Sequence, residues 1–96
     1  MRTIYKYELE ITDFQQIKVP VRSSVRSVQE ILGKLYVYIE IDLSEREFFT
    51  MLDFRIVGTG NPIEFLTSID PLSTDRPYNF LSTVKNGPFI WHVYWR

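Results

Sequence analysis

The sequence contains no cysteine, only one histidine and no long run of apolar residues. The absence of cysteine excludes disulfides, thiol nucleophiles, iron–sulfur clusters and zinc sites that use thiolate ligands. With His92 as the one imidazole, a metal site would have to be built from carboxylates. No apolar stretch approaches the ~18 residues that a membrane-spanning helix needs. The sequence therefore predicts no metal and no cofactor.

The sequence also lacks a large net charge of either sign, because it has 11 Lys and Arg residues and 12 Asp and Glu residues. Proteins that bind nucleic acid without sequence specificity are usually strongly basic, so this activity is not expected here. A net charge near zero weakens repulsion between copies and favours a homodimer or a higher homo-oligomer. Charged residues recur through Met1–Lys6, which leaves no apolar core for a signal peptide and predicts a cytosolic protein.

What the chain has is alternation of apolar and polar residues, with many aromatic side chains. The length of 96 residues suits one domain spanning 1–96. The alternation has the period of a half-buried β-strand rather than that of a helix. It predicts strands at residues 4–11, 16–21, 25–31, 35–41, 48–57, 78–84 and 89–95.

These segments predict an all-β fold, a small antiparallel β-sandwich or barrel of about seven strands with at most one short helical turn. Pro20 lacks a backbone donor, so its strand should lie at an edge or end near this residue, whereas the last strand is apolar on both faces and should be central or in an interface. Residues 43–52 are ambiguous between a short helix and a turn followed by a strand. The irregular segment 63–77 is long for a compact domain and is a candidate functional element.

Catalytic chemistry finds little support in the residues. His92 can serve as a general base, but a hydrogen-bonded histidine in a strand is the more ordinary interpretation. The acidic clusters Glu8/Glu10 and Glu45/Glu47 fit solvated strand faces. No nucleophile motif is present. We therefore expect a protein that is not an enzyme, with no catalytic residues to name.

The glycine-rich bend Gly58-Thr59-Gly60, which follows the fifth predicted strand, is the strongest local motif. Such a bend can present backbone N–H groups to an anion, and an arginine and an asparagine flank it. A tight turn with a proline exit explains the same residues without any ligand. The candidate ligand-binding residues are Arg55, Gly58, Thr59, Gly60, Asn61 and His92.

Aromatic side chains on outward positions suggest a contact surface. Tyr36 and Tyr38, together with Tyr94 and Trp95, could anchor a protein partner, stack on bases or line a self-association seam. Packing within a second sheet is the alternative, because a sandwich needs two covered inner faces.

Several segments together resemble a family of small proteins encoded by tailed bacteriophages and prophages. The resemblance rests on residues 4–9, on Gln16-Ile17 before Pro20, on Val28-Gln29, and on the longer segments 54–63 and 87–94. The chain departs from the family pattern in two places. Asn61 stands where many relatives have histidine, and Phe65–Tyr78 is longer and more apolar.

The resemblance implies a phage accessory protein in the cytoplasm of the infected bacterial host, and it supplies no catalytic residues. The leading hypothesis is an inhibitor or sequestering factor that acts on a host or anti-phage defence system. Such a protein would cover a protein surface or hold a nucleotide-like signal. The alternatives are a structural or decoration protein of the virion and a small enzyme acting on phosphoesters.

Overall fold

The structure is a computed structural model that describes residues 1–45, 47–66 and 76–96. Its seven strands are β1 (Arg2–Leu9), β2 (Gln15–Pro20), β3 (Ser24–Ile31), β4 (Lys34–Asp42), β5 (Phe49–Gly58), β6 (Asn79–Asn86) and β7 (Phe89–Trp95). Single turns of 3-10 helix lie at Leu43–Glu45 and Glu64–Leu66. The predicted all-β fold is confirmed. Among the described residues no helix has the length and apolarity to cross a membrane.

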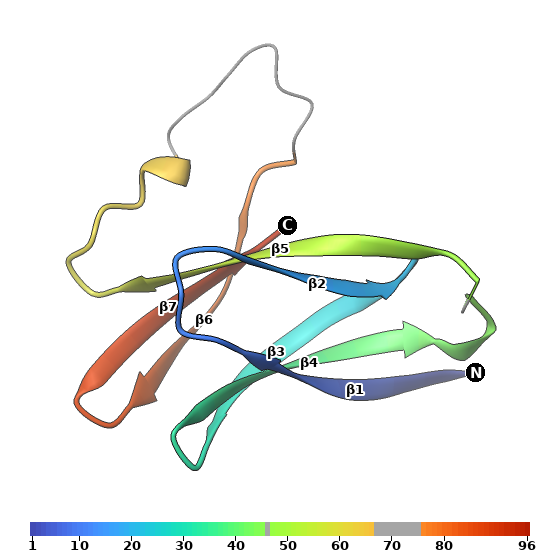
Figure 1. Cartoon of the computed structure of the whole chain (residues 1–96), viewed down its shortest axis with the longest axis horizontal. Helices are drawn as coiled ribbons and strands as arrows, with labels where there is room; N and C mark the ends of the chain where they lie inside the picture. Colours follow the sequence, from blue (N-terminus) through green and yellow to red (C-terminus); the bar gives the residue numbers. More distant parts are fainter. Residues whose placement is uncertain (46, 67–75) are drawn as a thin grey trace.

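The strands form two antiparallel sheets, ordered β1-β4-β3 and β2-β5-β7-β6 (Figure 1). β4 shows why this sequence forms strands, since buried and half-buried residues alternate along its whole length. This alternation turns Leu35, Val37, Ile39 and Ile41 toward the other sheet and leaves Tyr36 and Tyr38 on the outer face. At one side of the molecule β3 lies beside β6, where the Asn86 side-chain amide donates to the Gly33 carbonyl at 3.3 Å.

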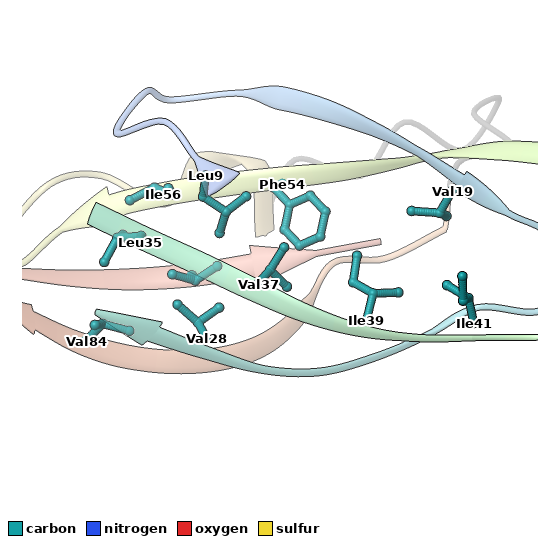
Figure 2. Close-up of a cluster of buried hydrophobic side chains, with 11 residues drawn as sticks. Leu9, Val19, Val28, Leu35, Val37, Ile39, Ile41, Phe54, Ile56 and Val84 are labelled. Atoms are coloured by element: carbon teal, nitrogen blue, oxygen red, sulfur yellow. The ribbon is translucent and has the colours of Figure 1, made fainter. Parts of the chain in front are cut away.

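The core fills the space between the inner faces of the two sheets. Figure 2 shows side chains from both sheets pointing into this shared interior. Phe54 at the middle of β5 is its largest fully buried member. The other buried residues of the cluster are Leu9, Val19, Val28, Leu35, Val37, Ile39, Ile41, Ile56, Val84 and Val93.

Strand positions follow the sequence in detail. β2, which ends at Pro20, is an edge strand, and β7 is central between β5 and β6 as its two apolar faces predicted. The ambiguous segment after β4 is a 3-10 turn followed by strand β5. Ser44 lies within the 3-10 turn and does not start an α-helix, and its hydroxyl and its N–H both donate to the Asp42 carboxylate that precedes the turn.

β5 is longer than the pairing that each of its neighbours offers. β2 pairs with residues 49–54 of β5, and β7 pairs with residues 54–58. The C-terminal half of β5 therefore extends beyond β2, and the N-terminal half extends beyond β7. A cleft lies beside each half. Much of the predicted functional loop 63–77 lies outside the described residues, but its ends at 63–66 and 76–77 flank β5.

Candidate functional site

The first cleft lies beside the C-terminal half of β5 and contains two of the predicted ligand-binding residues, Arg55 and Asn61. We call it the Arg55 cleft. It has a volume of about 510 Å³ and is lined by Asp13, Arg55, Ile56, Val57, Asn61, Pro62, Glu64 and Phe65. Its charged side chains are one guanidinium and two carboxylates, so the lining carries both signs.

Arg55 is held in place by aromatic rings rather than by a carboxylate. Its Nε donates a 3.0 Å hydrogen bond to the Tyr78 hydroxyl. Its guanidinium carbon lies 4.8 Å from the ring centre of Phe14 and 5.3 Å from that of Phe65, within the range of cation–π attraction. Phe65 also packs edge-on against Tyr78 and Tyr94, with ring centres 5.1 and 5.4 Å apart. The side chain is therefore fixed before any ligand arrives.

The glycine-rich bend forms a separate cleft with the β6–β7 turn. This hairpin cleft has a volume of about 420 Å³ and is lined by Gly58, Thr59, Asn61, Pro88, Phe89, Ile90 and Trp91. Gly58 is required there by close approach, since a Cβ would lie 3.0 Å from the Asn61 amide nitrogen and 3.3 Å from the Trp91 ring. Gly60 has φ +89° and makes the turn itself possible. The bend thus serves packing and chain reversal.

His92 lies on the outer face of β7 between two threonine hydroxyls. Its Nε2 is 2.8 Å from Thr59 Oγ1, and its Nδ1 is 2.9 Å from Thr83 Oγ1. A hydroxyl can donate or accept, so one threonine hydroxyl accepts a hydrogen bond from the ring N–H and the other donates a hydrogen bond to the unprotonated ring nitrogen. Both ring nitrogens are satisfied, which matches the ordinary interpretation of a hydrogen-bonded strand histidine. The ring also ties the glycine-rich bend to β6.

The four aromatic residues predicted as one contact surface do not lie together. Tyr36 and Tyr38 are half-buried on the outer face of the three-stranded sheet. Tyr94 is on the outer face of the other sheet, whereas Trp95 turns inward and packs against the core. The separation has a simple cause, because successive residues of a strand point to opposite faces.

A cleft that the sequence did not predict lies beside the N-terminal half of β5. We call it the arginine cleft. It has a volume of about 530 Å³ and is lined by Val21, Arg22, Ser23, Thr50, Met51, Leu52, Asp53, Arg76, Trp95 and Arg96. Among the described lining residues are three arginines and one carboxylate, so positive charge predominates in this part of the cleft. Trp95, Met51 and Leu52 supply an apolar wall next to these charges.

Hydrogen bonds order one side of the arginine cleft. Arg96 Nε donates to Asp53 Oδ2 at 2.9 Å, and its Nη1 donates to the Arg76 carbonyl at 3.1 Å. Its guanidinium also lies 4.4 Å from the centre of the Tyr78 ring. Gln16 donates to the other oxygen of Asp53 at 2.8 Å. Arg96 and Asp53 are thus fixed structural groups of the wall.

Arg22 enters the arginine cleft from a strained turn. Its φ of 63° is in the left-handed region, which costs an L-residue about 1 kcal/mol relative to its usual conformations. The Arg22 carbonyl accepts a 3.1 Å hydrogen bond from Arg2 Nη2. A non-glycine residue kept at positive φ is a feature that clusters at functional sites.

A family model, Domain of unknown function (DUF7352), matches residues 1–96. The chain belongs to this family. Searches of curated proteins and of solved structures returned no match. Within the described part of the chain no group of three or more His, Asp or Glu side chains is arranged to hold a metal ion.

Sequence reasoning missed the arginine cleft because its cations are far apart along the chain. Arg22 follows β2, Arg76 precedes β6 and Arg96 follows β7. No spacing rule joins these positions, and only the pairing of β2, β5 and β7 brings them to one cleft. The one local signal, a bulky residue at a position that requires positive φ, is visible only in the backbone.

Proposed function

We propose that this domain acts by binding, and that the arginine cleft holds a phosphorylated, nucleotide-like small molecule. The observation that carries the proposal is the convergence of Arg22, Arg76 and Arg96 on a cleft whose described lining includes one carboxylate, that of Asp53. Guanidinium groups bind phosphate oxygens through paired, charge-assisted hydrogen bonds. A volume of about 530 Å³ is within the usual range for small-molecule sites.

The apolar wall supports the nucleotide part of the proposal. Trp95 and Met51 line the same cleft as the arginines, and an indole ring is a good stacking partner for a planar base. The mixed lining suits a ligand with a charged end and a flat apolar end better than it suits inorganic phosphate.

Charge also decides between the two clefts beside β5. The Arg55 cleft, which sequence reasoning favoured, holds two carboxylates for its one guanidinium. Among the described residues, carboxylates outnumber guanidinium groups in the lining of the Arg55 cleft, whereas guanidinium groups outnumber the carboxylate in the arginine cleft, which favours an anion in the second. We therefore assign the phosphate to the arginine cleft.

The biological setting stays a prediction drawn from the resemblance to phage proteins. In an infected bacterium, a domain with this cleft would sequester a nucleotide signal of a host or anti-phage defence system. The protein-covering form of inhibition, the virion component and the phosphoester-acting enzyme remain alternatives. Mass spectrometry of purified virions tests the structural alternative.

The test is a thermal-shift titration with linear and cyclic nucleotides, read together with tryptophan fluorescence. A bound nucleotide should raise the melting temperature in proportion to the logarithm of its concentration. Arg76→Gln and Arg22→Gln should each weaken binding about 10- to 100-fold, as expected for a lost charge-assisted hydrogen bond. Arg26→Gln is the matched control, because Arg26 is an exposed residue of β3 in the other sheet.

Two results would contradict the proposal. A flat response to every nucleotide removes nucleotide binding altogether. Binding that survives Arg76→Gln but is lost in Arg55→Gln places the phosphate in the Arg55 cleft, as the sequence predicted.

A further inference from the structure

Arg55 offers unused hydrogen-bond donors from a rigid position. Its Nε is occupied by the Tyr78 hydroxyl, and its guanidinium plane is covered by Phe14 and Phe65. Within residues 1–45, 47–66 and 76–96, its terminal Nη atoms make no hydrogen bond or ion pair. A guanidinium fixed in this way is prepared to bind a carboxylate with two parallel hydrogen bonds.

The opposite charge lines the same cleft. Asp13 and Glu64 both contribute to its wall, and Asp13 is an exposed carboxylate at the point where the chain turns into β2. A ligand that used Arg55 alone would be repelled by these groups. The complement of the whole lining is a molecule that carries an anionic group and a cationic group close together.

The β5 backbone adds one donor and one acceptor. Asp53 exchanges both of its backbone hydrogen bonds with Arg96 on the β7 side. In an antiparallel ladder the N–H and C=O groups of successive residues point to opposite sides of the strand. Ile56 is three residues after Asp53, so its N–H and C=O point away from β7. The pairing of β2 with β5 ends at Gln15 and Phe54, which leaves this peptide group at the floor of the Arg55 cleft.

We propose that the Arg55 cleft is a second, independent site, which binds a free α-amino acid in its zwitterionic form. Arg55 binds the α-carboxylate, and Asp13 binds the α-ammonium group. The Ile56 N–H and C=O complete the two sets of hydrogen bonds. Phe65, Val57 and Pro62 form the apolar part of the wall and select an apolar or aromatic side chain, and Asn61 and Glu64 complete the lining. This assignment does not depend on the nucleotide proposed for the arginine cleft.

Calorimetric titration of the full chain with L-phenylalanine and two derivatives tests the assignment. N-acetyl-L-phenylalanine lacks the ammonium group, and L-phenylalaninamide lacks the carboxylate. Each derivative should bind at least 10-fold more weakly than L-phenylalanine, because each leaves one charge of the cleft unpaired. Equal affinity for either derivative, or no binding of L-phenylalanine at millimolar concentration, overturns the proposal.

Two variants test which residue binds the carboxylate of the amino acid and which binds its ammonium group. Asp13→Asn should weaken L-phenylalanine about 10-fold and leave N-acetyl-L-phenylalanine unchanged. Arg55→Gln should weaken L-phenylalanine similarly and leave the amide unchanged. Asp13 is exposed, so its variant should fold normally and keeps the test valid if Arg55→Gln loses stability. Arg76→Gln is the control, and a loss of amino-acid binding in it contradicts a separate site.

Discussion

The outer faces of the two sheets stabilise their charged side chains in different ways. On the three-stranded sheet most cation contacts are ion pairs, of Arg2 with Glu40, of Arg26 with Glu40 at 3.8 Å and of Lys34 with Glu8 at 3.3 Å. Lys6, which lies 4.6 Å from the centre of the Tyr36 ring, is the exception among the described residues of this face. On the four-stranded sheet, cations lie over rings: Lys18 over Phe49, Arg55 over Phe14 and Arg96 over Tyr78. Asp53, paired with Arg96, is the carboxylate that β5 contributes to this face.

The difference indicates where ligands should bind. An ion pair uses the charge of both partners, so the three-stranded face offers little to an incoming charged molecule. A ring stabilises a cation without neutralising it, and its donors stay available to a ligand. Both charged clefts beside β5 contain arginines that contact rings or line the cleft directly. This difference supports our proposal that ligands bind on the four-stranded sheet.

The largest effect should come from breaking the core on which both faces depend. Phe54 is 0 % exposed and lies between the sheets. Phe54→Ala should lower the free energy of unfolding by about 3–5 kcal/mol, the usual cost of emptying a buried phenylalanine site. Phe80→Ala is the matched control, because Phe80 is 57 % exposed and makes one edge contact with Tyr94. Urea unfolding should show a loss of only about 0.5–1.5 kcal/mol for the control.

A tyrosine on each face gives the next comparison. Tyr78→Phe keeps the ring but removes the hydroxyl that accepts the hydrogen bond from Arg55. We expect a loss of about 1–2 kcal/mol, since the lost bond involves a charged donor at a half-buried position. In the described residues the Tyr36 hydroxyl makes no side-chain hydrogen bond, so Tyr36→Phe should stay within about 0.5 kcal/mol of the parent. Equal losses would remove the distinction between the two faces.

Two substitutions at Arg22 separate the effect of backbone strain on stability from the effect of the guanidinium group on binding. Arg22→Gly and Arg22→Gln both remove the guanidinium from the arginine cleft, but only glycine accepts a φ of 63° without strain. Arg22→Gly should therefore be about 0.5–1 kcal/mol more stable than Arg22→Gln in thermal unfolding, while both lose nucleotide affinity. If the two variants have the same stability, the backbone at this position is not strained.

The smallest effect concerns the ion pairs of the three-stranded face. The hydrogen bond from Arg2, aided by the charges of Arg2 and Arg26, holds the pKa of Glu40 below its ordinary 4.5. A lowered carboxylate pKa stabilises the folded state, fully so above the ordinary pKa, and this contribution is lost as the pH falls from there through the lowered pKa. Glu40→Gln should therefore lose less stability than the parent as the pH falls below the ordinary pKa of 4.5 in paired urea titrations. A steeper loss in the variant would contradict the ion-pair description.

Much of the fold could be predicted from alternation alone. A strand with one covered face repeats every second residue, and β4 follows this rule without exception. The edge position of β2 followed from Pro20 and the central position of β7 from its two apolar faces. The candidate site was less accessible. Arg55 and Asn61 do share a cleft, but the carboxylates of that cleft and the ring contacts of Arg55 come from other segments.

The sequence by itself determined which residues form strands and which faces of them are apolar, because those properties depend on neighbours one or two positions away. The tertiary structure decided what lies beside each half of β5. That depends on where β2 and β7 stop pairing, and on loops that bring Arg22, Arg76 and Arg96 together from three distant segments. Charge complementarity acts through space, so the sign of each cleft could be known only once the strands were paired.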